Sequence, residues 1–202
     1  MKFSKLALTA AVAMSAAAAQ AAAPANLVTN GSFESTVLNN GAWLVTSNID
    51  GWTGPIELRN SVEGIAQDGS NFAELDVVTN STITQTIYGT GMVNLSFWYS
   101  ARPSTAAGTN DLGFSLGSLS GTVLTGEGNA SSLHGWQQFA GIADLGTSGS
   151  AVLSFAALGA SDSVGGSLDN VSVTAVPEPE AVAMLLAGLG LVAGIARRRN
   201  RK

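Results

Sequence analysis

The segment that follows Val176 most limits what this chain can fold into. Pro177 and Pro179 stand two residues apart, and each proline lacks the backbone N–H that a continuing strand or helix needs. Residues 181–196 then carry no charge, and five of the last six residues are Arg or Lys. A helix of this length spans about 24 Å, slightly less than a hydrocarbon core of about 30 Å. We therefore predict that the main fold is complete before residue 177, and that a membrane-spanning helix at 181–196 keeps its cationic end in the cytoplasm.

The N-terminus has the pattern of a secretory signal peptide. Lys2 and Lys5 precede an uncharged, Ala-rich segment at 6–19, and an A-x-A cleavage motif follows at 19–21, with 21–23 as a second choice. The apolar segment is too short to span a membrane. We predict a signal peptide at 1–23, a single domain at 24–176, and a C-terminal sorting segment at 177–202.

The central domain is strongly acidic. Between Asn26 and Val176 there are 12 Asp and Glu against two Arg and no Lys, which gives a net charge of −10. Such a domain is repelled by nucleic acids and by anionic headgroups, and it attracts divalent cations or cationic partners. The chain has no Cys, which excludes disulfides, thiolate metal sites and thiol nucleophiles.

The pattern of the central domain predicts an all-β fold. Residues 92–100 alternate, with apolar side chains at 93, 95, 97 and 99 and polar side chains or Trp98 between them. No segment keeps a helical period for long, and Gly- and Ser-rich segments such as 117–121 are expected as loops. Other β-rich runs predict strands at 43–46, 56–59, 72–78, 82–88, 112–116, 135–143, 151–158 and 168–175. So many short strands indicate a two-sheet β-sandwich.

The tail resembles the PEP-CTERM sorting signal. The resemblance covers residues 176–202 and rests on Pro177-Glu178-Pro179, the apolar segment, and Arg197-Arg198-Arg199, in that order. It implies a Gram-negative bacterium that makes exopolysaccharide, export by the secretion machinery, and a transient stay in the inner membrane. It also implies an exosortase-type membrane protease that removes the tail, so that the protein reaches the cell surface or extracellular matrix. The alternative is an ordinary tail anchor that is never cut.

The domain itself resembles the galactose-binding-domain-like jelly rolls, which include many carbohydrate-binding modules. The opening motif is Asn26-Leu-Val-Thr-Asn-Gly-Ser-Phe-Glu34, and the pattern continues at 51–52, 68–76, 83–87, 95–103, 135–136 and 168–173. The resemblance implies a jelly-roll β-sandwich, and a binding role more often than catalysis.

Asp169 is the most informative acidic residue. It shares strand parity with Val171 and Val173, so it should point inward, where a carboxylate without a partner is costly. In the resembled fold, one acid of the opening motif and one of the closing strand hold a structural calcium ion. Carried over, the calcium ligands are Glu34 and Asp169, with further oxygens from the turn that contains Asp68 and Asn71. The alternative is that Asp169 only accepts hydrogen bonds from backbone amides.

Sugar rings stack on flat aromatic side chains, so tryptophans are the candidate ligand-binding residues. Trp98 falls on the polar face of its strand and is the best candidate for an exposed platform, unless a loop covers it. Trp43 is the second candidate. Trp52 and Trp136 each follow a glycine and are expected to fill the core.

Candidate catalytic groups are few. Glu74 and Asp76 share one strand face, about 7 Å apart at Cα, which permits a glycosidase interpretation, although acids on one strand more often form a solvated face. His134 is the only histidine, is expected at the surface, and has neither a Gly-x-Ser-x-Gly motif nor a second nitrogen or sulfur ligand for zinc. We therefore expect an exported, non-catalytic surface or matrix protein that binds or organises exopolysaccharide. The alternatives are a structural or adhesive protein without a sugar site, and a secreted polysaccharide hydrolase.

Overall fold

The computed structural model describes residues 24–176 and 179–199. The predicted signal peptide at 1–23 lies outside the described residues, as do Pro177, Glu178 and residues 200–202. Within the described part, ten strands are followed by one helix. The elements are β1 (Trp43–Ile49), β2 (Trp52–Asn60), β3 (Asn71–Glu74), β4 (Thr82–Tyr88), β5 (Met92–Ser100), β6 (Leu112–Leu116), β7 (Leu119–Val123), β8 (Gln137–Asp144), β9 (Ser150–Ala157), β10 (Ser167–Ala175) and α1 (Pro179–Arg199).

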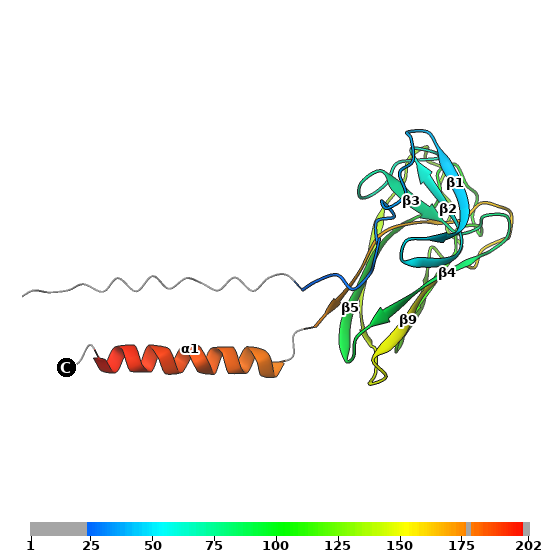
Figure 1. The fold of residues 1–202 in the computed structure, drawn as a ribbon. Coiled ribbons are helices and arrows are strands. Elements are labelled where there is room, and N and C mark those ends of the chain that lie inside the picture. Colours follow the sequence, from blue (N-terminus) through cyan, green and yellow to red (C-terminus); the bar gives the residue numbers. More distant parts are fainter. Residues whose placement is uncertain (1–23, 177–178, 200–202) are drawn as a thin grey trace, which may run out of the picture.

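The strands form one antiparallel hydrogen-bonded path that folds into two layers. Its order is β7-β6-β9-β4-β2-β3-β10-β5-β8, and β1 pairs with β2 beside this path. The long strand β2 joins the layers, because Thr53 pairs with Thr84 of β4 while residues 57–60 pair with β3. β5 lies on one side of the sandwich and β4 with β9 on the other (Figure 1). The all-β fold predicted from the sequence is therefore confirmed.

Aromatic side chains join the two layers. Phe97 of β5 is fully buried, and its ring centroid lies 5.1 Å from that of Phe114 on β6 and 5.0 Å from that of Phe155 on β9. Trp52 is 1% exposed, as expected for a core residue, and its ring centroid lies 5.7 Å from that of Phe33. The contacts of Phe97 cross from one layer to the other, so the alternation seen in residues 92–100 directs their apolar face into the core between the layers.

The expectation that residues 117–121 form a loop is wrong for most of that segment. The chain turns at Gly117 and Ser118, and β7 then pairs with β6 along its whole length. A Cβ atom on Gly121 would lie 2.8 Å from Cζ of Phe114, so the missing side chain makes room for that ring. The Ser- and Gly-rich composition here reflects a strand that packs over a large aromatic residue on its neighbour.

α1 includes the predicted apolar segment 181–196. Side chains at 185–193 are exposed along the helix. No helix in residues 24–176 or 179–199 combines the length and the apolar character needed to cross a membrane. The spanning helix expected from the sequence is therefore not confirmed.

Candidate functional site

The outer face of the β3-β10-β5-β8 layer carries a row of polar residues. Glu57, Glu74, Ser167 and Ser100 are successive Cα partners across β2, β3, β10 and β5. Directly paired residues lie on the same face of a sheet, so these side chains share the face opposite the core. All four are nevertheless buried, at 8%, 0%, 1% and 1% exposure. Loops therefore cover this end of the outer face.

His134 connects the covering loops to the sheet. Its Nδ1 lies 2.9 Å from the carbonyl oxygen of Ile65, and its Nε2 lies 3.0 Å from Oγ of Ser167. Because a carbonyl only accepts, Nδ1 carries the proton and Nε2 accepts from the serine hydroxyl. Burial lowers the pKa of His134, which favours this neutral form. The expectation of a surface histidine is wrong, because His134 is half-buried between a loop and β10.

Trp136 belongs to the same covering layer and not to the main core. Its indole Nε1 donates to the carbonyl of Ile65 at 3.0 Å. Its ring centroid lies 4.7 Å from that of His134 and 6.1 Å from that of Phe72, and Phe72 also lies on the outer face. Half-buried Trp136 thus helps to close the loops over the polar row.

A buried charge cluster lies beneath these loops. Arg59 donates from Nε to Glu57 at 2.9 Å, and its Nη2 lies 3.7 Å from Oε2 of Glu74. Burial raises the pKa of Glu74 to about 7, although the Arg59 charge lowers it in part. Arg59 Nη1, Glu74 Oε2 and Asp76 Oδ1 are buried without a hydrogen-bond partner.

The structure does not place Glu74 and Asp76 on a solvated face. Both side chains have an exposed fraction of 0%. Glu74 Oε1 accepts from the backbone N–H of Asp76 at 2.9 Å, and Asp76 Oδ2 accepts from the N–H groups of Asp162 and Val164. A glycosidase needs its two carboxyl groups on either side of a bound sugar, whereas these two hold backbone together beneath the loops.

Trp98 lies on the uncovered half of the same outer face. It pairs with Gln138 of β8 on one side and with Asp169 of β10 on the other. The expectation that Asp169 points inward with Val171 and Val173 is therefore wrong, because a register shift between Asp169 and Ser172 interrupts the alternation and leaves Asp169 on the outer face. Trp98 is half-buried, while Gln138 and Asn94 on the same face are exposed. An indole that is partly open and flanked by amide side chains can stack against one ring and hydrogen-bond to its substituents.

Trp43 lies on the same face, further along the sheet. It is 59% exposed and pairs with Arg59 of β2. Four strand spacings separate β1 from β5, which corresponds to roughly 19 Å. The two candidate tryptophans are therefore not neighbours, and the covered charge cluster lies between them.

The predicted calcium ligands surround one turn, at residues 67–71. Asp169 Oδ2 accepts from the N–H groups of Gln67 and Asp68 at 2.8 and 3.0 Å. Glu34 Oε1 accepts from the N–H groups of Ser70 and Asn71 at 2.8 and 2.6 Å. Burial raises the pKa of Asp169 to about 7. The two carboxyl groups thus hold the turn from both of its ends.

The fit of this turn to calcium depends on the remaining oxygens. In the described part of the chain, no three acidic or histidine side chains converge into a group that could hold a metal ion. Asn71 Nδ2 donates to the carbonyls of Phe33 and Thr36, and its Oδ1 is buried without a hydrogen-bond partner. Asp68 is exposed. Calcium at Glu34, Asp68, Asn71 and Asp169 stays a prediction, and it would need backbone carbonyls or water to reach six ligands.

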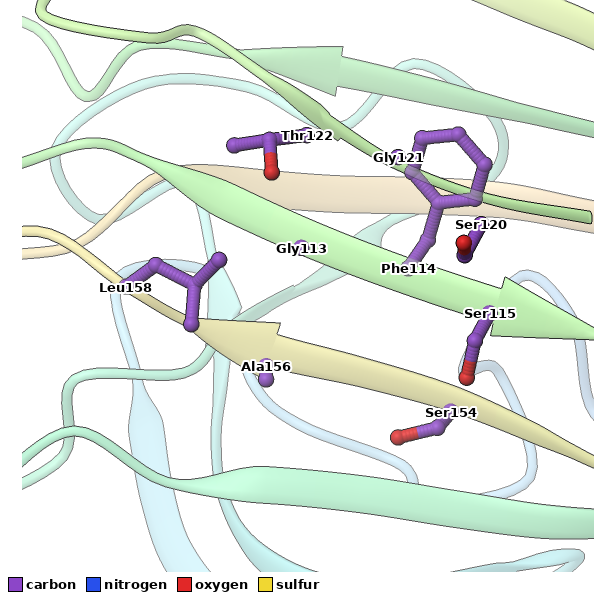
Figure 2. A pocket seen from close by; sticks show the side chains of 9 residues that line it. All are labelled: Gly113, Phe114, Ser115, Ser120, Gly121, Thr122, Ser154, Ala156 and Leu158. Carbon is purple, nitrogen blue, oxygen red and sulfur yellow. The ribbon is translucent and has the colours of Figure 1, made fainter.

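A shallow depression of about 380 Å³ lies on the outer face of the other layer. Figure 2 shows Ser115 and Ser154 near one end of it and Leu158 at the other, with Phe114 beside Gly121. Its lining carries no charged side chain. The sequence analysis missed it because one of its walls, β7, was expected as a loop; the alternation of Ser and Thr across 115–122 was the available signal.

The C-terminal segment has a recognisable sequence family. Residues 175–202 match the PEP-CTERM protein-sorting motif. The match includes Pro177, Glu178, Pro179 and Arg197-Arg198-Arg199, and it confirms the resemblance found in the sequence. It indicates an exported protein that is sorted through its C-terminus. A search among curated proteins gave no match.

Solved structures share the sandwich at low sequence identity. A family 16 carbohydrate-binding module has a TM-score of 0.50 and 14% identity, with 74% of this chain and 100% of that chain covered. The module TmCBM61, solved with β-1,4-galactotriose, has a TM-score of 0.48 and 15% identity, and the match covers 75% of this chain and 99% of that module. The enzymatically active domain of bacteriophage CBA120 tailspike protein 4 has a TM-score of 0.44 and 19% identity, and the match covers 75% of this chain and 21% of the tailspike chain. At 14% identity the likeness to the family 16 module establishes the β-sandwich alone, so binding and catalysis have to be judged from the side chains.

Proposed function

We propose that this is an exported, non-catalytic surface or matrix protein whose β-sandwich binds exopolysaccharide. Trp98 carries the proposal: it is a partly exposed indole on a sheet face, flanked by exposed amide side chains. The C-terminal motif supports export, and a likeness to a carbohydrate-binding module supports a fold suited to binding. The burial of Glu74 and Asp76 favours binding over hydrolysis.

The charge of the domain narrows the class of ligand. Twelve acidic side chains against two arginines repel polymers rich in carboxylates, such as those built from uronic acids. Around Trp98 the outer face presents Asn94, Ser96 and Gln138, which are neutral donors and acceptors. A neutral or amino-substituted polysaccharide fits this face best.

The same proposal includes removal of the tail by an exosortase-type protease. β10 ends at Ala175, and the N–H of Val176 donates to the carbonyl of Met92 at 3.0 Å. A cut near Pro177-Glu178-Pro179 would therefore fall just beyond the last contact of the sandwich and leave the domain whole. Until that cut, α1, with the arginines of its last turn, would hold the chain at the inner membrane.

Replacement of Trp98 tests the sugar site. Retention of the mature protein in affinity gels that contain polysaccharide from the producing cells is expected to fall in Trp98→Ala by about tenfold or more, which corresponds to at least about 1.4 kcal/mol. Trp98→Phe keeps an aromatic face and is expected to keep part of the retention. Trp43→Ala is expected to weaken binding of long polymers only, because Trp43 lies roughly 19 Å from Trp98.

The thermal midpoint of each variant serves as the folding control. If Trp98→Ala has the thermal midpoint of the wild type and is retained by the polysaccharide gel as strongly as the wild type, Trp98 does not bind the sugar and the proposed site is wrong.

A further inference from the structure

Three turns meet at one end of the sandwich. The turn between β4 and β5 bonds to the turn between β8 and β9, because the N–H of Gly89 donates to the carbonyl of Gly149 at 2.9 Å. Ser118, in the turn between β6 and β7, donates its N–H to the carbonyl of Asp144 at 3.0 Å. Figure 1 shows the β4–β5 turn (green) and the β8–β9 turn (yellow) at the same end of the molecule. This exit end, where the chain also leaves the sandwich, comprises residues 87–93, 116–120, 142–152 and 173–176.

The exit end is tied closely to α1. The N–H of Val176 donates to the carbonyl of Met92 at 3.0 Å, so the chain is still held to the sandwich at residue 176. Only two residues separate Val176 from Pro179, where α1 begins. Three Cα–Cα steps of 3.8 Å reach at most about 11 Å. Whatever surface holds the start of α1 therefore lies within that distance of the exit end.

The exit end carries almost none of the charge of the domain. Its segments contain one of the 12 acidic side chains, Asp144, and neither of the two arginines. Asp144 is used locally, because its Oδ1 accepts from the N–H of Gly146 at 2.8 Å. All but one unit of the net charge of −10 therefore lies elsewhere on the domain, and this end approaches anionic headgroups at little electrostatic cost.

Each layer of the sandwich has a pair of exposed apolar side chains at the exit end. Tyr88 of β4 and Val152 of β9 are 75% and 55% exposed and are offset by two residues in the strand register. On the other layer, Met92 of β5 and Ile142 of β8 are 49% and 55% exposed, with the same offset. Two residues span about 7 Å along a strand, close to the headgroup region of a bilayer, which is roughly 5–7 Å deep on each side. Tyr suits this region because its ring is apolar and its hydroxyl stays hydrated.

We propose that, until the tail is removed, the exit end docks on the headgroups of the lipid bilayer that holds α1, with Tyr88 and Met92 inserted from the two layers. The proposal rests on the membrane attachment proposed above for the tail. The tether selects this occupant, because a bilayer that holds α1 is already within reach and its effective concentration at the exit end is high. Trp98 lies six residues from Met92 along β5, about 20 Å away, so docking leaves its face free for a polymer.

Fluorescence quenching in vesicles tests the contact, because the chain has no cysteine of its own and accepts a label at a single introduced thiol. Full-length Thr90→Cys and Thr82→Cys are labelled with the same fluorophore and reconstituted into phosphatidylcholine vesicles that contain a lipid with a nitroxide on its headgroup. Thr90 lies in the β4–β5 turn, and Thr82 is the matched control at the opposite end of β4; both side chains are exposed. Quenching is expected at residue 90 and not at residue 82, which lies about 20 Å further from the bilayer.

A charge substitution separates docking from the effect of the tether alone. Tyr88→Glu, added to Thr90→Cys, puts an acid at the contact and is expected to lower the ratio of docked to undocked chains by about tenfold. Leu133→Glu, at a 61% exposed position outside the exit end, adds the same charge and is expected to leave the quenching unchanged. The thermal midpoint of each variant confirms that it is folded.

Quenching at residue 90 that Tyr88→Glu lowers and Leu133→Glu does not supports the proposal. A chain that does not float with the vesicles contradicts the membrane attachment of the tail and this proposal together. If the chain floats with the vesicles but residue 90 stays unquenched, or if Tyr88→Glu leaves the quenching unchanged, attachment of the tail stands and docking on lipid is wrong. A protein partner such as the protease would then be the candidate to cover this end.

Discussion

Glu74 should give this protein an unusual dependence of stability on pH. The side chain is fully buried, and burial raises its pKa from 4.5 to about 7 in the folded chain. A carboxyl with a raised folded-state pKa contributes stability that is complete below its ordinary pKa and is lost as the pH rises through the folded value. The contribution of Glu74 to the free energy of unfolding should therefore fall between pH 4.5 and about 7, and stay constant above.

The size of this effect follows from the two pKa values. Their difference is worth about 3 kcal/mol, since one pKa unit corresponds to about 1.4 kcal/mol. Glu74→Gln removes the ionisation and keeps a carbonyl oxygen to accept the hydrogen bond from the N–H of Asp76. Relative to this variant, the wild-type protein should lose about 3 kcal/mol as the pH rises from 4.5 to 7.5.

Urea unfolding followed by tryptophan fluorescence at several pH values measures this difference. Asp169, whose pKa is also raised to about 7, is present in both proteins, so its contribution cancels. Glu127→Gln, at an exposed loop position, is the control, and its free energy of unfolding should change with pH as that of the wild type does. A difference that does not change with pH would refute the argument. A wild type that gains stability with rising pH would show that Arg59 holds Glu74 ionised.

Two further predictions concern calcium binding at the turn of residues 67–71 and removal of the tail. In the wild-type mature protein, calcium is expected to raise the thermal unfolding midpoint and EGTA to lower it. Neither effect is expected in Asp169→Asn, because Asp169 and Glu34 hold the turn at 67–71. If neither calcium nor EGTA changes the wild-type midpoint, the calcium prediction is wrong. Mass spectrometry of protein from the cell surface is expected to find a chain that begins between Ala22 and Pro24 and ends near Pro177-Glu178-Pro179. Full-length chain in the cytosol would contradict the export assignment.

The strands were predictable where the signal is local. Alternation in residues 92–100 predicted the buried face of β5, and Val93, Leu95 and Phe97 are buried as expected. β4 has the predicted bounds 82–88, because its alternation of Ile, Thr and Gln is equally regular. The sorting tail was likewise readable, since its motif, apolar segment and cations follow one another along the chain.

The candidate site was only partly predictable. Strand parity placed Trp98 on the polar face, but it gave no means to tell that loops cover Glu57, Arg59 and Glu74 on that same face. β7 was missed because its residues become a strand only when paired with β6. The meeting of three turns at the exit end depends on the strand order, which no local pattern contains.

By itself, the sequence determined that this chain has an acidic β-domain and a C-terminal sorting motif, because charge, alternation and motif order are properties of residues adjacent along the chain. Tertiary structure alone decided which half of the outer face is covered. His134 and Ile65 meet there across 69 residues of sequence, and His134 reaches Ser167 across 33. That long-range closure buries Glu74 and leaves Trp98 half-exposed, because burial depends on what packs above a side chain and not on its neighbours in the chain.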